Sequence, residues 1–320
     1  MNILHINSYY IDNHLYAHLY HKLDSLVKQK IYVPIKHNRR PEFQFRLKNS
    51  ELFFSSKIKR FHKYNYFGKI KTLTKDLEGL GLHQNTDFVH AHNLFNDGGI
   101  ACRLKEKYGL KYIVAVRLTD INLQYRYMLN RRFYAQKILE EAESIIFISP
   151  QYHKKFFSML PQKFIDKIEK KCKIIPNGVD EIWHENKGDK NPDPAEKVEL
   201  LFVGRIINTK NLFKLVDAIS ILNKKKNRKY RLTIVGGRSV SESKYFDNFM
   251  YYISNHDWIE YKGKIENATE LLPLYRKADI FVMPSKHELF GLVYIEAISQ
   301  FTPVVYSKDE GISSFLAGSN

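Results

Sequence analysis

Residues 279–296, DIFVMPSKHELFGLVYIE, contain an apolar run, a polar loop that starts at Pro284 and an amphipathic segment that starts at Gly291. This pattern predicts a strand, a loop and the N-terminus of a helix. A helix N-terminus presents unpaired N–H groups and the positive end of the helix dipole, so an anion such as a diphosphate can bind there. Glu288 and Glu296 lie on either side of the predicted helix start, where their carboxylates can accept hydrogen bonds from sugar hydroxyls. The alternative for this pair is a solvated helix face.

The alternation of short apolar runs with helical periodicity extends through the whole chain. Segments such as Gly99–Tyr108 and Phe133–Ala142 predict helices, and a polar stretch at 181–197 predicts a linker. The predicted strands lie at 2–6, 31–35, 87–91, 111–116 and 144–148, and then at 199–203, 231–235, 258–261, 280–283 and 303–306. We therefore expect two consecutive α/β domains, 1–180 and 198–320, each with a mainly parallel sheet. Ligands in such folds bind beyond the carboxyl ends of the strands.

The chain ends shortly after the strand around Val304, although an α/β domain usually continues for several more elements. The expectation is that the second domain is incomplete at its C-terminus or unusually small.

The bulk composition favours an ordinary globular protein of the cytoplasm. Apolar residues make up 44% of the chain, and no apolar run approaches the roughly 20 residues of a membrane helix. Residues 1–7 predict a first strand rather than a signal peptide. Cys102 and Cys172 lack metal-ligand spacing, so we expect two unpaired thiols.

The charge of +17 is concentrated in the first domain. Residues 1–185 hold 31 Lys and Arg against 18 Asp and Glu, a net +13, so residues 186–320 contribute +4. The excess is greatest at 43–71, where basic residues alternate with aromatic ones. This composition predicts contact with an anionic membrane surface, on the inner face of the membrane. It would also suit RNA, although we do not expect nucleic acid, and a generally basic surface is the third interpretation.

The second domain opens with a predicted strand that ends at Gly204, followed by Arg205 and Lys210 across a turn. Two cations at this spacing can point toward one ligand, with Arg binding two phosphate oxygens and Lys acting as a point charge. The alternative is two surface cations beside a helix start. The phosphate interpretation gains weight because this strand end and the loop 288–291 are expected at the same edge of one sheet.

Several short motifs in this order resemble the family 4 glycosyltransferases of the GT-B fold. Those in the second domain are Gly204-Arg205 with Lys210, Gly236-Gly237, Gly263-Lys-Ile265-Glu-Asn267, and Glu288 and Glu296 with Phe290-Gly291 between them. Those before it are Asp87-Phe-Val-His90-Ala-His92-Asn93, Gly98-Gly99, Val116-Arg-Leu-Thr119-Asp120 and Ile175-Pro176-Asn177-Gly178-Val179-Asp180. The resemblance implies two Rossmann-like domains that face each other across a cleft. It also implies a retaining transferase that moves a sugar, of the hexosyl type, from a nucleotide diphosphate sugar to an acceptor hydroxyl.

The resemblance also implies roles for residues of the second domain. Arg205 and Lys210 would neutralise the diphosphate leaving group. The backbone amides of Phe290, Gly291 and Leu292 would bind the distal phosphate and the sugar. Glu288 would bind sugar hydroxyls, Glu296 the ribose hydroxyls, and Ile265 would border the nucleobase. No Asp-x-Asp occurs in the sequence, so no metal or other cofactor is expected, and basic side chains would replace the metal.

In the first domain the resemblance implies that His92 contacts the donor sugar from the cleft. His90 is expected to be structural, with its side chain on the opposite face from His92 if the strand continues. Thr119 and Asp120 would line the acceptor side, with helix capping as the alternative. No carboxylate pair suits a covalent intermediate, which is consistent with front-face substitution. The loop 7–14 lacks the paired glycines that many relatives have, which leaves it available for acceptor recognition.

The sequence therefore predicts a transferase that adds a sugar to a glycan or lipid-linked acceptor in cell-surface polysaccharide biosynthesis. Two alternatives remain at this point. One is a nucleotide-sugar epimerase of the same fold, and the other is a catalytically silent binding subunit that partners an active transferase.

Overall fold

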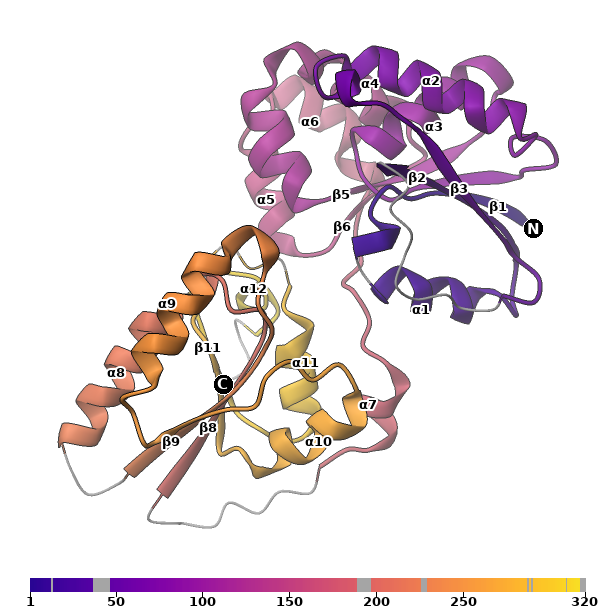
Figure 1. Cartoon of the computed structure of the whole chain (residues 1–320). Helices are drawn as coiled ribbons and strands as arrows, with labels where there is room; N and C mark the ends of the chain where they lie inside the picture. Colours follow the sequence, from indigo (N-terminus) through magenta and orange to yellow (C-terminus); the bar gives the residue numbers. More distant parts are fainter. Residues whose placement is uncertain are drawn as a thin grey trace. The chain divides into compact units, whose positions relative to one another are not determined.

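The computed structural model describes residues 1–12, 14–36, 47–188, 197–225, 229–286, 288, 290–308 and 310–316. The chain divides into two compact units, Met1–Ile175 and Pro176–Asn320 (Figure 1). The boundary thus precedes the predicted end of the first domain at 180. The segment predicted as a linker, 181–197, begins with a short helix, α7 (Glu181–Glu185), whose Trp183 is buried. Residues 189–196 of that segment lie outside the described residues.

The first unit is built on a parallel sheet of seven strands in the order β3-β2-β1-β4-β5-β6-β7. The strands are β1 (Asn2–Ile6), β2 (Lys28–Lys36), β3 (Glu51–Ile58), β4 (Phe88–Ala91), β5 (Tyr112–Val116), β6 (Ser144–Phe147) and β7 (Cys172–Ile174). The α-helices are α1 (His14–Leu23), α2 (Tyr66–Gly79), α3 (Asn96–Tyr108), α4 (Arg132–Glu141), α5 (Pro150–Phe157) and α6 (Gln162–Ile168). Helices α2, α3 and α4 cover one face of the sheet and α1 lies on the other (Figure 1).

The start of α3 shows how the sequence fits this helix to the sheet. The Asn93 side chain accepts hydrogen bonds from the backbone N–H groups of Asn96 (2.9 Å) and Asp97 (3.2 Å), which would otherwise be unpaired at the helix N-terminus. Gly98 lies so close to α4 and β5 that a Cβ atom would come within 2.9 Å of Ile138 on α4 and 3.1 Å of Val114 on β5. Close packing therefore fixes the start of α3 against α4 and β5.

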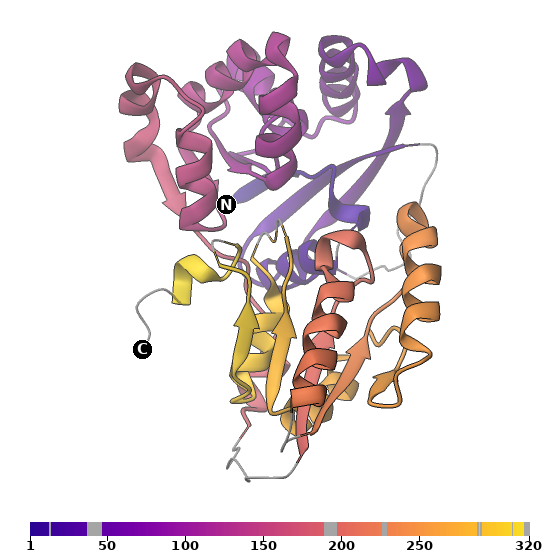
Figure 2. The same ribbon diagram turned by 90° about the vertical axis from the view of Figure 1, so that its left-hand side faces the viewer.

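The second unit has a parallel sheet of five strands in the order β10-β9-β8-β11-β12. The strands are β8 (Lys197–Val203), β9 (Lys229–Val235), β10 (Ile259–Tyr261), β11 (Ile280–Met283) and β12 (Val304–Tyr306). The further helices are α8 (Leu212–Lys225), α9 (Ser243–Ile253), α10 (Ala268–Lys277), α11 (Leu292–Ser299) and α12 (Ser313–Leu316). Helices α8 and α9 cover one face of this sheet, and α10 and α11 cover the other (Figures 1 and 2).

The prediction of two α/β units with parallel sheets is confirmed, and every predicted strand is present to within three residues. Two strands were not predicted, β3 and β7, and each lies at an edge of the first sheet. Half of the residues of β3 are exposed and Ser55 is its one buried residue, and its apolar run is only three residues long (52–54), shorter than that of a central strand. Among the described residues, no helix combines the length and the apolar character needed to cross a membrane.

Candidate functional site

Glycines bring the loops of the second unit close together at the carboxyl ends of its strands. The N–H of Gly204, after β8, donates to the carbonyl of Val235 (2.9 Å), and the N–H of Gly236, after β9, donates to the carbonyl of Gly263 (2.8 Å). A Cβ atom on Gly236 would lie 1.9 Å from the carbonyl oxygen of Gly204. These positions need glycine because two backbones touch there. The loops after β8, β9 and β10 therefore lie in backbone contact at the carboxyl edge of this sheet, which we call the strand edge. Longer side chains of the neighbouring loops project from it.

Lys210 and Glu288, both predicted as site residues, form an ion pair at this edge. Lys210 ends a 3₁₀ turn (Asn208–Lys210) after β8, and Glu288 lies in the loop after β11, the neighbouring strand. The two loops are also joined by the N–H of Lys286, which donates to the carbonyl of Thr209 (2.7 Å). The side chains are only 16% and 14% exposed, so the pair is largely shielded from water. A bound diphosphate could compete with Glu288 for the ammonium group.

The N-terminus of α11 lies on the same loop. Gly291 precedes the helix with φ +74°, and a Cβ atom there would lie 2.6 Å from the ring of Tyr294. The Tyr294 hydroxyl donates to the carbonyl of Met283 at the end of β11 (2.6 Å). The backbone N–H groups of Gly291 and Leu292 are thus at the helix start, as predicted for binding an anion. Phe290 is buried and its ring contacts that of Phe315.

Glu296 has a different environment from the one expected for binding ribose. Its carboxylate accepts a hydrogen bond from the hydroxyl of Tyr275 on α10 (2.8 Å). Burial raises the pKa of Glu296 to about 7, the negative charge of Asp180 adds to this shift, and the Tyr275 hydrogen bond opposes it. Burial therefore disfavours the ionised form of the Glu296 carboxyl group. Its role at a ribose stays a prediction.

Arg205 and Ile265 lie in the loops beside this edge. Arg205 is exposed at the start of the loop after β8, and Ile265 is half-buried after Gly263. Their contacts with a diphosphate and a nucleobase stay predictions.

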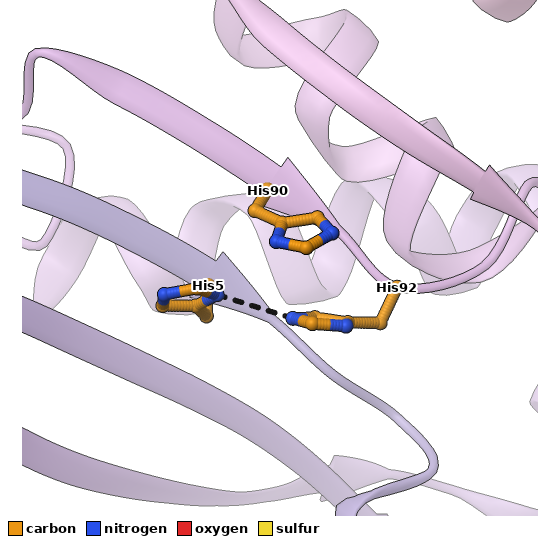
Figure 3. Close-up of side chains that lie close together, drawn as sticks. All are labelled: His5, His90 and His92. Atoms are coloured by element: carbon orange, nitrogen blue, oxygen red, sulfur yellow. Dashed lines mark hydrogen bonds between the residues drawn. The ribbon is translucent and has the colours of Figure 1, made fainter. Parts of the chain in front are cut away.

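In the first unit the strand register brings three histidines together (Figure 3). His5 on β1 is the register partner of His90 on β4, and His92 follows β4 directly. Nδ1 of His5 lies 3.1 Å from Nε2 of His92, and the rings of His90 and His92 stack with centroids 4.0 Å apart. The expectation that His90 and His92 lie on opposite faces is wrong, because residues two apart on a strand share a face. The sequence analysis also missed His5, since a single histidine in an apolar strand resembles a core residue.

His92 is completely buried. Its Nε2 also lies 3.2 Å from the hydroxyl of Tyr20, and its carbonyl accepts a hydrogen bond from Nε of Arg117 (3.0 Å). Contact with a donor sugar would require this ring to become accessible. That role stays a prediction.

The ring nitrogens of His5, His90 and His92 could hold a metal ion, because one nitrogen from each ring lies within 4.8 Å of the other two. Burial lowers the pKa of each ring, and a neutral imidazole is the form that binds metals. Two features oppose such a site. Stacked rings hold their lone pairs in nearly parallel planes, 28° apart for His90 and His92, so these do not converge on one point. The Arg117 guanidinium, which further lowers the pKa of His90 and His92, would repel a cation.

We expect His90→Gln to weaken the acid sensitivity of folding. Burial, with a smaller effect from Arg117, lowers the pKa of His90 to about 3, below its ordinary value of 6.5. Below pH 6.5 His90 therefore binds a proton in the unfolded chain but not in the folded one. The free energy of unfolding consequently falls as the pH is lowered toward 3. Between pH 7.5 and 4.5 the wild type should lose about 3 kcal/mol more unfolding free energy than the variant.

Urea unfolding at both pH values measures this difference. Asp97 and Asp120, whose pKa values burial raises to about 8 and about 6, act in the opposite direction but in both proteins alike. His184→Gln, at an exposed histidine, is the control and should behave as the wild type. Equal losses in the wild type and His90→Gln would contradict the prediction.

Thr119 and Asp120 serve different purposes in the described structure. Asp120 is fully buried, and its carboxylate accepts hydrogen bonds from the backbone N–H groups of Arg117 (2.9 Å) and Leu94 (3.0 Å), so it braces two loops. Thr119 precedes a π-helical turn (Asp120–Tyr125) without capping it, so the capping alternative is wrong for Thr119. Its hydroxyl instead bonds that of Tyr9, in the loop after β1. A role of either residue on the acceptor side stays a prediction.

Comparison with known proteins shows which family and which fold this chain resembles. Residues 184–318 match the family described as glycosyl transferases group 1. The whole chain resembles the sucrose-phosphate synthase of Thermosynechococcus elongatus, with a TM-score of 0.71 at 17% identity over 98% of this chain and 83% of that one. The fold is GT-B. HepE of Anabaena, solved in complex with UDP-glucose, gives a TM-score of 0.65 at 15% identity over 99% of this chain and 82% of HepE.

Two curated relatives extend the comparison at the level of sequence. An uncharacterized glycosyltransferase of Methanocaldococcus jannaschii is 24% identical over 260 residues, which are 81% of this chain and 66% of that protein. The capsular polysaccharide biosynthesis glycosyltransferase CapH of Staphylococcus aureus is 30% identical over 217 residues, which are 67% of this chain and 57% of CapH. The matches thus span less than two thirds of each relative. Together with the family match, they support a glycosyltransferase of the GT-B fold.

Proposed function

We propose that the protein is a retaining glycosyltransferase of family 4, which moves a hexose from a nucleotide diphosphate sugar to a hydroxyl of a glycan or lipid-linked acceptor. The proposed setting is cell-surface polysaccharide biosynthesis at the cytoplasmic face of the membrane. The capsular role of CapH supports this setting, and the UDP-glucose bound to HepE supports a nucleotide-sugar donor.

The observation that carries the proposal is the Lys210–Glu288 pair beside the N-terminus of α11. Departure of a nucleoside diphosphate places negative charge on the leaving phosphate. A preorganised ammonium group and helix N–H groups stabilise that charge where it develops. Glu288, once released from Lys210, offers a carboxylate to sugar hydroxyls. We propose that Lys210, together with Arg205, supplies the positive charge that a metal ion provides in other transferases.

The test is release of nucleoside diphosphate. The protein is incubated with a panel of nucleotide sugars and a membrane extract that supplies acceptors, and nucleoside diphosphate and labelled product are measured. Transfer of label to an acceptor is the expected result. An interconverted sugar without transfer would indicate the epimerase, and neither binding nor turnover of any common donor would refute the proposal.

We further propose that the surface formed by β3, the turn Arg60–Lys63 and the start of α2 contacts an anionic membrane. Within 47–71, the described part of the predicted region 43–71, the side chains of Phe61, Tyr64 and Phe67 are 54%, 84% and 47% exposed. Exposed cations accompany these rings, namely Lys57, Lys59, Arg60, Lys63 and Lys71. Exposed rings can insert at headgroup depth while the cations meet lipid phosphates.

Replacing Phe61, Tyr64 and Phe67 by serine should reduce sedimentation with phosphatidylglycerol vesicles at least tenfold. The expected loss arises because the apolar contacts disappear while the charge stays the same. Tyr251→Ser, at an aromatic residue that is 79% exposed on α9, is the matched control. Unchanged sedimentation of the triple variant, or stronger binding to RNA than to vesicles, would contradict the membrane surface.

A further inference from the structure

A cavity of about 210 Å³ opens in the first unit at the carboxyl ends of β1, β2 and β3. It is lined by Ser8 and Tyr9, in the loop after β1, and by Asn96 at the start of α3. Its apolar lining residues are Ile11, Pro34, Ile58 and Leu73, and its charged ones are Lys36 and Lys69. At about 30 Å³ per water molecule, the cavity has room for roughly seven waters, or a phosphate with a few carbon atoms.

The positive charges of Lys36 and Arg131 act on Lys69, and Asp97 is the carboxyl group that acts on it in the opposite direction. Lys69 hydrogen-bonds the side-chain oxygen of Asn96, and within the described residues neither lysine forms an ion pair. Burial lowers the pKa of Lys69 to about 8, and the charges of Arg131 and Lys36 lower it further. Arg131 lies over the ring of Tyr66, 4.6 Å from its centroid, and its buried Nε has no hydrogen-bond partner there.

The Asp97 carboxyl group beside this cluster does not neutralise its positive charge. Asp97 is completely buried, and its oxygens accept hydrogen bonds from the N–H of Ser8 (3.2 Å) and the side-chain amide of Asn93 (2.5 Å). Burial raises the pKa of Asp97 to about 8, and the charge of Lys69 acts in the opposite direction. Even an ionised Asp97 would balance only one of the three positive charges. The cluster of Lys36, Lys69 and Arg131 therefore keeps a net positive charge in a partly desolvated pocket, where an anion is strongly favoured.

We propose that this cavity binds a phosphate group of the acceptor, held by Lys36 and Lys69, with an alkyl or sugar portion against the apolar lining residues. A phosphate matches both the charge of the lysines and the volume of the cavity, and the apolar residues suit the carbon atoms to which it is esterified. Tyr9, which lines the cavity, also bonds the hydroxyl of Thr119, a predicted acceptor residue. The identification of the ligand as an acceptor rests on the proposed function, whereas the phosphate site itself does not.

The test is direct binding of hexyl phosphate to the whole protein, measured by calorimetry without any donor. Lys69→Met should weaken binding at least tenfold, and Lys36→Met severalfold, while hexanol should not bind measurably to any of the proteins. Methionine keeps the aliphatic stem of a lysine that is already desolvated, so the unfolding midpoint should not fall. Lys75→Met, at an exposed lysine six residues further along α2, is the matched control and should bind as the wild type.

Equal affinity of the wild type and Lys69→Met for hexyl phosphate would overturn the proposal. A second arm identifies the source of the phosphate. If Lys69→Met also loses binding to vesicles that contain phosphatidic acid, the ligand is a lipid headgroup; if vesicle binding is kept while hexyl phosphate binding is lost, it is a soluble phosphate ester. Because no turnover is needed, Lys69-dependent binding would stand even if the transferase activity were refuted.

Discussion

Lys210→Met is expected to lower kcat/KM for sugar transfer by about a hundredfold to a thousandfold, the usual cost of removing one group that stabilises charge in the transition state. The Lys210 side chain is 16% exposed, so its charge acts in an environment that water screens poorly. Without it, Glu288 would also repel the departing diphosphate. The effect should therefore exceed that of losing a surface cation.

The measurement is initial-rate kinetics with the donor that the transfer assay identifies. Lys214→Met, at an exposed lysine on α8, is the matched control and should keep the wild-type rate. Removing Lys210 leaves the shielded Glu288 carboxylate without its cationic partner, so the unfolding midpoint of the variant is expected to fall. The rates are therefore measured well below the unfolding transition of the variant, so that a kinetic loss can be assigned to the charge. A loss of less than about tenfold would mean that this ammonium group is not the one that faces the leaving phosphate.

The sequence sufficed to place Lys210 and Glu288 at one edge of a sheet because parallel strands end at a common edge. The prediction required only that the strands at 199–203 and 280–283 belong to one parallel sheet, and β8 and β11 are in fact neighbours in it. The ion pair of Lys210 with Glu288 confirms that the two loops meet. Glu296 shows the limit of this reasoning: its side chain bonds Tyr275, 21 residues earlier, and no local pattern specifies that contact.

In the first unit less could be predicted from the sequence. The histidine cluster and the lysines of the cavity are brought together by strand register and by packing between segments that are far apart in the chain. His5 becomes part of a cluster only because it is paired with His90, 85 residues away along the chain. Lys36 and Lys69 lie among many lysines of a basic domain, and nothing in their spacing distinguishes them from solvated cations. Their significance comes from the cavity that β2, β3 and α2 enclose. Such a site follows from tertiary structure and could not be predicted from periodicity.

Gly236→Ala is expected to destabilise the protein by about 3 kcal/mol or more, a large effect for a single methyl group. The new Cβ atom would lie 1.9 Å from the carbonyl oxygen of Gly204 and 3.5 Å from Ile206. Neither backbone can move easily. The N–H of Gly204 is bonded to Val235, and the N–H of Gly236 is bonded to Gly263, so the strand ends are held on both sides.

Urea unfolding of Gly236→Ala and Gly79→Ala separates this clash from the general effect of replacing glycine. Gly79 is the last residue of α2, and a Cβ atom there would have no atom within 4 Å. Because alanine restricts the unfolded chain and favours helix, Gly79→Ala should be neutral or stabilising by up to about 1 kcal/mol. If Gly236→Ala cost less than about 1 kcal/mol, the loops after β8 and β9 could not be in backbone contact. The close strand edge that positions Lys210 and the start of α11 would then need to be reconsidered.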